Sequence, residues 1–135
     1  MIEYREDPAA ISVDQLVGGF FEGWPFPPSP ELHLAHLRSA EVAVLAVNAE
    51  TERVVGFVTA IGDGVLTCFI PLLEVLPEYR GRGIGQELMR RVLARIGDRY
   101  SIDLVCDPGL VPFYECLGGV PGTAMMWRNR DAVAR

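Results

Sequence analysis

The sequence of 135 residues lacks the features of several large classes of protein. No uncharged apolar run reaches about eighteen residues, so we expect no transmembrane helix. The N-terminus has no basic region followed by an apolar one, so we expect no signal peptide. The three cysteines are odd in number and show no paired spacing, which fits a reducing cytoplasm. The net charge of −6 argues against nucleic acid as a partner and suits a cationic one such as an amine.

Two common phosphate-binding motifs are also missing. A Rossmann turn needs a third glycine at a fixed spacing, but Gln86 takes that place after Gly81 and Gly83, and Leu88 takes it after Gly83 and Gly85. A Walker loop needs Gly-Lys-Ser or Gly-Lys-Thr, and the chain contains neither. An unrelated ATP- or NAD-binding domain would therefore have to use these glycines in another pattern.

The chain does contain a glycine-rich turn between two largely apolar segments. Residues Val65–Leu76 are almost all apolar, which predicts a strand buried on both faces. Residues Ile84–Ile96 carry apolar residues at helical spacing, which predicts an amphipathic helix. Glycines in the turn would let a phosphate approach the unpaired amides of the helix start. Because Arg80 and Arg82 add positive charge there, the turn is a candidate anion site.

The rest of the pattern predicts one α/β (α+β) domain over residues 1–135, with a mixed sheet and helices on both sides. Pro71 lies inside the long apolar strand and cannot donate to a ladder, so it requires a bulge or a splayed neighbour. The other expected strands are Ile2–Tyr4, Glu41–Asn48, Arg53–Ile61, Ile102–Cys106 and Ala124–Arg128. The other expected helices are Val13–Phe21, Pro30–Arg38 and Pro112–Leu117.

Two motifs resemble those of a known family. The motif Arg-x-x-Gly-x-Gly begins at Arg80, directly after the apolar strand, and Phe-Tyr-x-x-Leu-Gly begins at Phe113. Together they resemble motif A and the Phe-Tyr ending of the GNAT superfamily of acyl-CoA N-acyltransferases. The resemblance implies the GNAT fold, in which a mixed, mostly antiparallel central sheet is splayed between its fourth and fifth strands. In this chain those strands would be Val65–Leu76 and Ile102–Cys106.

The resemblance also implies that acetyl-CoA binds where the two strands part. The backbone of Leu73, Glu74 and Val75 would contact the pantetheine arm, and the glycine turn would receive the pyrophosphate. Asp107 stands where the family often has asparagine, so it can accept the amide proton of pantetheine but cannot donate one. The cofactor-binding residues implied in this way are Leu73, Val75, Arg80, Gly81, Arg82, Gly83, Ile84, Gly85, Gln86 and Asp107.

Two residues are candidates for acid–base chemistry. Glu74 is the only charged residue in Val65–Leu76, and it is either a general base for the substrate ammonium or a structural carboxylate. Tyr114 stands where the family places a tyrosine next to the thioester sulfur. It is either the acid that protonates the leaving thiolate or an aromatic that packs a short helix onto the sheet. Cys106 has no histidine near it in sequence, so we favour direct attack in a ternary complex over a covalent acyl-cysteine.

The acceptor is expected near the N-terminal helices, which lie over the acceptor cleft in the family. Phe20, Phe21 and Trp24 are therefore predicted to bind the substrate, or else to cover the edge of the core. His33 and His36 have no further metal ligand near them in sequence, so we predict no metal site and expect both rings to face solvent.

These patterns predict an N-acetyltransferase that moves an acetyl group from acetyl-CoA to a primary amine of an unidentified small molecule or peptide. The alternative is a non-catalytic acyl-CoA-binding or sensing module on the same fold. The family often dimerises, so the resemblance also points to a homodimer. Neither nucleic acid nor a membrane is expected as a partner.

Overall fold

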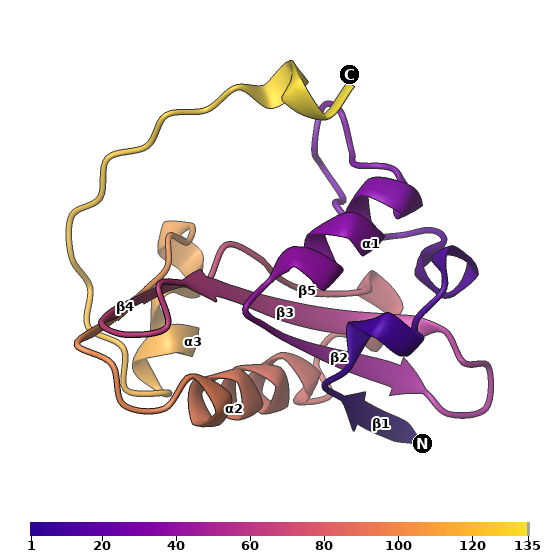
Figure 1. The fold of residues 1–135 in the computed structure, drawn as a ribbon, viewed down its shortest axis with the longest axis horizontal. Coiled ribbons are helices and arrows are strands. Elements are labelled where there is room, and N and C mark those ends of the chain that lie inside the picture. Colours follow the sequence, from indigo (N-terminus) through magenta and orange to yellow (C-terminus); the bar gives the residue numbers. More distant parts are fainter. Residues whose placement is uncertain (135) are drawn as a thin grey trace.

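The computed structural model describes residues 1–134, which form a mixed sheet with helices on both faces (Figure 1). The strands are ordered β1-β2-β3-β4-β6, and β5 pairs with β3 beyond the end of β4. The β4–β6 pair is parallel and the other pairs are antiparallel, which confirms the predicted mixed sheet. The strands are β1 (Ile2–Arg5), β2 (Val42–Asn48), β3 (Val54–Gly62), β4 (Thr67–Phe69), β5 (Leu73–Val75) and β6 (Ser101–Asp103).

Three α-helices and several short 3-10 turns complete residues 1–134. The helices are α1 (Pro30–Ser39), α2 (Ile84–Ile96) and α3 (Val111–Glu115). The 3-10 turns are Pro8–Ala10, Val13–Leu16, Pro77–Tyr79, Pro108–Leu110 and Arg130–Ala134. The start of α1 follows from its cap, since the Ser29 hydroxyl accepts a hydrogen bond from the Leu32 N–H at 3.1 Å. None of these helices is both long and apolar enough to cross a bilayer.

Two apolar layers hold the helices on the sheet. On one face, α2 packs the fully buried Leu88 and Val92 against β2 and β3. On the other face, Leu37 of α1 packs in a second cluster with Phe57 of β3. The second layer does not extend over β4, where Phe69 remains 38% exposed. The burial of these side chains is the main stabilising contribution to the fold.

The predicted strand Val65–Leu76 is two short strands, β4 and β5, and the prediction that it is buried on both faces was wrong. The break falls at Ile70–Leu72, around Pro71, whose missing N–H cannot extend a ladder. Both strands still pair with β3, so the chain stays in the sheet at the break but loses β6 as its second neighbour. Val65 itself is 72% exposed.

The predicted helix Val13–Phe21 was wrong beyond Leu16, where the 3-10 turn ends. Gly18 and Gly19 take φ values of 83° and 91°, and Phe21 has a φ of 62°. These left-handed conformations cannot continue a right-handed helix. The cap predicted at Ser12 is present, because its N–H donates to the Gln15 side chain at 2.9 Å.

The predicted last strand, Ala124–Arg128, is also absent. Residues 119–129 contain no helix or strand and are exposed along their whole length. In Figure 1 this segment leaves α3, swings past β4 and runs outside the rest of the ribbon. A strand needs a partner edge to satisfy its backbone groups, and within residues 1–134 this segment has none.

Candidate active site

The two strands predicted to splay apart, β4 and β6, share only a short ladder, Thr67–Phe69 with Ser101–Asp103. The Ile70 N–H donates to the Asp103 carbonyl at 2.9 Å, which closes the parallel pairing of β4 with β6. Past that point β5 pairs with β3 alone, and no strand of residues 1–134 pairs with it on the other side. We call this opening between β5 and residues 104–106 the seam. It confirms the splayed sheet predicted from the family motifs.

The register of β5 decides which backbone groups face the seam. Leu76 donates its N–H to the Val55 carbonyl at 2.8 Å, and the Leu72 carbonyl accepts from the Thr59 N–H at 3.1 Å. Because alternate residues of a strand point to opposite neighbours, Leu73 and Val75 direct their N–H and C=O groups away from β3 and into the seam. The backbone of Glu74 faces β3, so among these three residues the expected backbone contacts fit only Leu73 and Val75.

The glycine turn gives open access to the start of α2. Gly81 and Gly83 have φ values of 78° and 81°, and a Cβ on either would meet no atom within 4 Å. Gly83 caps α2 without a side-chain hydrogen bond, so the first amides of the helix remain available to an anion. Ile84 is buried and anchors this helix turn, whereas Gln86 is exposed.

Both arginines of the turn are oriented by local contacts. The Arg80 Nε–H donates to the Val75 carbonyl at 3.1 Å, and its guanidinium lies 3.5 Å from Glu22. The Arg82 guanidinium donates to the Glu78 carbonyl at 3.0 Å and lies 5.0 Å from the centre of the Tyr79 ring. Donors remain free on both guanidinium groups, which keep positive charge beside the helix start.

Glu74 is half-buried on β5, and its Oε1 accepts a hydrogen bond from the Phe21 N–H at 2.8 Å. Burial raises the pKa of this carboxyl; the Phe21 N–H and Arg80 oppose that rise, and Glu22 adds to it. Within residues 1–134 the second oxygen, Oε2, has no hydrogen-bond donor. The carboxylate thus holds the turn before α1 through Oε1 and leaves Oε2 able to accept a proton.

Tyr114 is half-buried on α3, far from Glu74 in sequence. Burial and, to a smaller extent, Cys106 raise the pKa of its phenol, so the hydroxyl stays protonated at neutral pH. The neighbouring Phe113 positions α3, because its ring edge would lie 3.6 Å from a Cβ placed on Gly85. This contact, which sequence reasoning missed, joins α3 to the start of α2.

The other residues expected on this flank are less enclosed. Asp107 is exposed, and its carbonyl accepts from the Leu110 N–H at 2.9 Å to start a 3-10 turn. Cys106 is half-buried and forms no disulfide. Cys68 and Cys116 form none either.

The aromatic residues predicted on the acceptor side differ in exposure. Phe21 is 4% exposed and packs on Trp24, which is 41% exposed, with ring centres 5.1 Å apart. Phe20 is half-buried, and its ring centre lies 5.4 Å from that of Phe57. A cavity of about 160 Å³ lies beside them, lined by Leu16, Gly18, Gly19, Phe20, Phe21, Pro28, Pro30 and His33.

The expectation that both histidines face solvent was wrong. His33 is 2% exposed among the rings of Phe20, Phe21 and Phe57, and its pKa is lowered to about 4 by burial and by His36. The His36 Nε2 lies 2.8 Å from the Thr59 hydroxyl, and burial lowers its pKa as well. The spacing of His33 to Leu34 and Leu37 could have shown that His33 lies on the buried face of α1.

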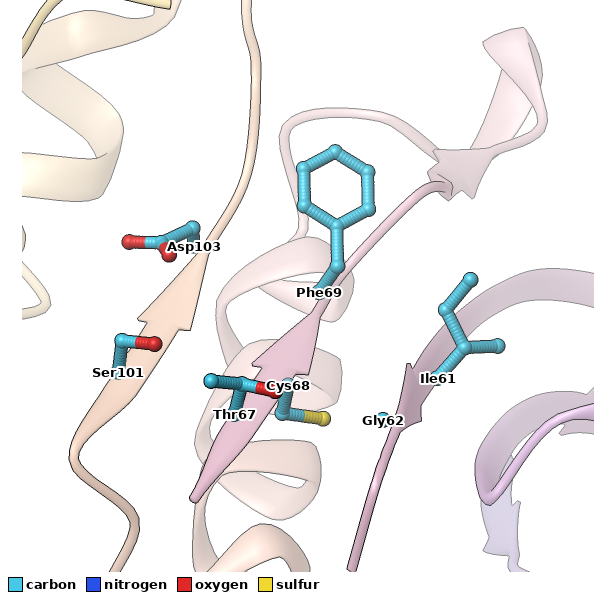
Figure 2. A pocket seen from close by; sticks show the side chains of 7 residues that line it. All are labelled: Ile61, Gly62, Thr67, Cys68, Phe69, Ser101 and Asp103. Atoms are coloured by element: carbon cyan, nitrogen blue, oxygen red, sulfur yellow. The ribbon is translucent and has the colours of Figure 1, made fainter.

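A second, larger hollow lies on the exposed face of β3, β4 and β6 (Figure 2). Its volume is about 380 Å³, and Phe69 and Asp103 stand at the end of it where the seam begins. It is lined by Ile61, Gly62, Thr67, Cys68, Phe69, Ser101 and Asp103.

Comparison with known proteins agrees with this geometry. A candidate acetyltransferase from Deinococcus radiodurans is 48% identical, with a TM-score of 0.94, and the match covers 98% of this chain and 92% of that one. An uncharacterized N-acetyltransferase of Prochlorococcus marinus is 34% identical over 80 residues, which are 58% of this chain and 44% of that protein. The chain thus spans less than half of this relative.

A more distant structure matches in fold alone. AAC(6')-Iy, solved with the bisubstrate analogue CoA-S-monomethyl-acetylneamine, is 17% identical with a TM-score of 0.67, covering 96% of this chain and 98% of that one. The model of the acetyltransferase (GNAT) family matches residues 11–118, which include the seam, the glycine turn and Tyr114. The chain therefore belongs to the GNAT family of acetyltransferases.

Proposed function

We propose that this protein transfers an acetyl group from acetyl-CoA to a primary amine of a small molecule or peptide. The observation that carries the proposal is the seam, where an edge of β5 that no strand of residues 1–134 pairs leads directly to the start of α2, which has no side-chain cap. An extended thioester arm that ends in a diphosphate needs this combination of an open strand edge and a helix start.

The residues present fit such a ligand. Leu73 and Val75 would hydrogen-bond the pantetheine arm, and the turn from Arg80 to Gln86 would hold the diphosphate through backbone amides and guanidinium groups. Asp107, which is exposed at the far side of the seam, would accept one amide proton. AAC(6')-Iy, which shares this fold and whose structure contains a CoA bisubstrate analogue, supports a CoA thioester as the ligand. Acetyl-CoA would supply an acyl group activated as a thioester.

Each proposed chemical role belongs to one group of this chain. Glu74 would take a proton from the ammonium of the acceptor, directly or through water, since its Oε2 is free and its pKa is raised. The Val75 N–H, directed into the seam, would stabilise negative charge on the carbonyl oxygen during attack. Tyr114 would give its proton to the leaving thiolate.

The acceptor would enter on the α1 side, where Phe20, Phe21 and Trp24 lie in the turn that Glu74 holds. Phe21 contributes mainly through its backbone and its support of Trp24, since its ring is buried. The three free cysteines support a reducing compartment, and we propose the cytoplasm.

The test combines binding and turnover. Calorimetry should show that CoA binds and that neither ATP nor NAD competes with it. Incubation with acetyl-CoA and a panel of amines should then release CoA, measured by chromatography because the exposed Cys116 would react with thiol reagents. Tight CoA binding without consumption of any amine would replace the enzyme by the sensing module, and the absence of CoA binding would overturn both.

A further inference from the structure

We propose that the cavity of about 160 Å³ beside Phe20 and Phe21, here called the His33 cavity, binds a small uncharged molecule or group that carries a hydroxyl. The ligand would place an apolar body of about the size of a six-membered ring in the cavity and hydrogen-bond the His33 imidazole through its hydroxyl. The cavity shares no lining residue with the seam or the glycine turn, so the proposal does not depend on the transfer reaction.

His33 is a buried polar group that the chain itself leaves unpaired. The residue is 2% exposed, and its Nε2 has no hydrogen-bond partner within residues 1–134. The rings of Phe20, Phe21 and Phe57 surround it, with centres 5.2, 5.0 and 4.4 Å from that of the imidazole. These rings hold the imidazole in place but offer it no strong hydrogen bond. Because buried polar atoms of native proteins are usually paired, the free Nε2 indicates that a ligand supplies the partner.

The lining of the His33 cavity disfavours a charged ligand. Apart from His33, the lining consists of leucine, glycine, phenylalanine and proline, so it offers no side chain that could pair with an ion. Burial and His36 lower the pKa of His33 to about 4, so the imidazole is neutral near pH 7. The Arg53 guanidinium is already engaged, since it donates to the Gly18 carbonyl at 3.2 Å and lies 3.4 Å from the Glu78 carboxylate. An ion in this cavity would lose its hydration without gaining a counterion.

The walls of the cavity are stiff enough to keep the space open. Gly18 and Gly19 have φ values of 83° and 91°, and a Cβ on Gly19 would lie 2.8 Å from the Leu76 side chain. Pro28 and Pro30 restrict the backbone of another wall. None of these four residues has a long side chain that could turn inward and fill the space. The volume of about 160 Å³ suits one ring, since an engineered apolar cavity of about 150 Å³ in another protein binds benzene.

The polar atom lies at the inner end of the cavity. Leu16, Phe21 and His33 are buried, whereas Gly18 and Gly19 are exposed to solvent. A ligand would therefore enter past the glycines, and its leading end would meet the imidazole. A hydroxyl suits this end because it can both donate and accept, so it pairs with Nε2 in either tautomer of the neutral ring.

Two sources could provide such a group. One is the side group of the acceptor amine, because Phe21 lines the cavity and its N–H donates to Glu74, the proposed base. This source rests on the proposed function. The other is a separate small molecule that binds as an effector. Both have the same chemistry, an uncharged ring with one hydroxyl.

The first experiment measures the binding of phenol and of benzene, its counterpart without the hydroxyl, by NMR titration. The wild type should bind phenol at least as tightly as benzene. In His33→Phe the hydroxyl would be buried without a partner, so the Kd for phenol should rise by about 10–100-fold. The Kd for benzene should change by less than about threefold, because an apolar ring of similar size replaces the imidazole.

His36→Gln is the matched control, since Gln can still hydrogen-bond the Thr59 hydroxyl that the His36 ring contacts. This variant should bind both probes as the wild type does. A wild type that does not bind phenol would overturn the proposal. So would an unchanged Kd for phenol in His33→Phe, or an equal loss of phenol and benzene, which would mean that His33 only shapes the cavity.

Nitrogen NMR covers the case in which His33→Phe fails to fold. In protein with ¹⁵N-labelled histidine, phenol should shift the resonance of His33 Nε2 and leave that of His36 Nε2 in place, because His36 already contacts Thr59. Benzene should shift the His33 resonance less. An unchanged His33 resonance at saturating phenol would contradict the hydrogen bond.

Steady-state kinetics distinguish the two sources. If the side group of the acceptor occupies the cavity, phenol should raise the KM for the amine without changing kcat. A separate ligand should bind together with the amine and leave that KM unchanged. Either pattern supports the site. Failure of phenol to bind would overturn the site but not the proposed function, and a protein that transfers no acetyl group should still bind phenol.

Discussion

The two flanks of the seam are held to different degrees. β5 pairs with β3 along its length and continues into Leu76, which is fully buried. On the other flank, residues 104–106 extend beyond the β6 ladder, and α3 contains no fully buried residue. The groups proposed to hold the cofactor thus lie mostly on the rigid flank, and Tyr114 lies on the weakly held one. Rigid elements preserve the geometry of a site, whereas a weakly packed segment can move with its ligand.

The largest expected effect compares one leucine on each flank. Leu76→Ala should lower the free energy of unfolding by about 2–5 kcal/mol, because it empties a buried site that also supports Gly19. Leu104→Ala should cost less than half as much, since Leu104 is only half-buried. Urea unfolding followed by fluorescence, at a concentration where both variants share one oligomeric state, would check this. Equal losses would remove the difference between the flanks.

The next prediction tests the chemistry assigned to the weakly held flank. Tyr114→Phe should lower kcat by about 100-fold, because it removes the proposed acid and little packing volume. The Kd for CoA should stay within about twofold. Tyr100→Phe is a suitable control, since Tyr100 is 89% exposed and should show no change in rate. A Tyr114→Phe enzyme with an unchanged rate would refute the acid while leaving the fold assignment in place.

On the rigid flank, Glu74→Gln should lower the rate and remove the acidic limb of its pH profile. In the wild type the rate should fall as pH drops through the raised pKa of Glu74, hence at a higher pH than for an ordinary glutamate. A carboxyl with a raised folded pKa stabilises the fold at acidic pH and loses that contribution as pH rises through the folded pKa.

The stability of the Glu74→Gln variant provides its control. Gln keeps an oxygen for the Phe21 N–H and carries no charge, so its Tm near pH 7 should equal or exceed that of the wild type. Thermal unfolding at pH 5 and pH 8 would measure this, and the advantage of Gln should be larger at pH 8. A marked loss of Tm near pH 7 would show that Glu74 is mainly structural.

The smallest expected effect concerns two glycines of the glycine turn. Gly83→Ala should destabilise the protein by about 1 kcal/mol, because its φ of 81° is unfavourable for alanine. Gly85→Ala should be neutral or slightly stabilising, since Gly85 is helical and an added Cβ would meet Phe113 at an ordinary 3.6 Å. Differential scanning calorimetry would detect the opposite signs. The same loss in both variants would mean that the φ of Gly83 is not strained.

The parts of the fold that were predictable are those set by consecutive residues. The glycine turn and α2 were predicted to the residue, since apolar periodicity and a run of glycines are local signals. The cap of α1 at Ser29 was predictable for the same reason. The helix after Ser12 was not, because apolar spacing alone does not reveal that Gly18, Gly19 and Phe21 would take left-handed conformations.

The candidate site also has a part that the sequence predicted and a part that only the fold revealed. Leu73 and Val75 were named from the family motif, but only the pairing of β5 with β3 fixes which backbone groups face the seam. The bond from Phe21 to Glu74 and the contact of Phe113 with Gly85 join residues distant in sequence, so no local pattern contained them.

The sequence by itself determined the family, the glycine turn and the helices around it, because each depends on a few neighbouring residues. Tertiary structure alone decided where the long apolar segment breaks, how deep His33 lies and that residues 119–129 have no strand to pair with among residues 1–134. The physical reason is that a strand edge and a buried ring are satisfied only by groups that folding brings from elsewhere.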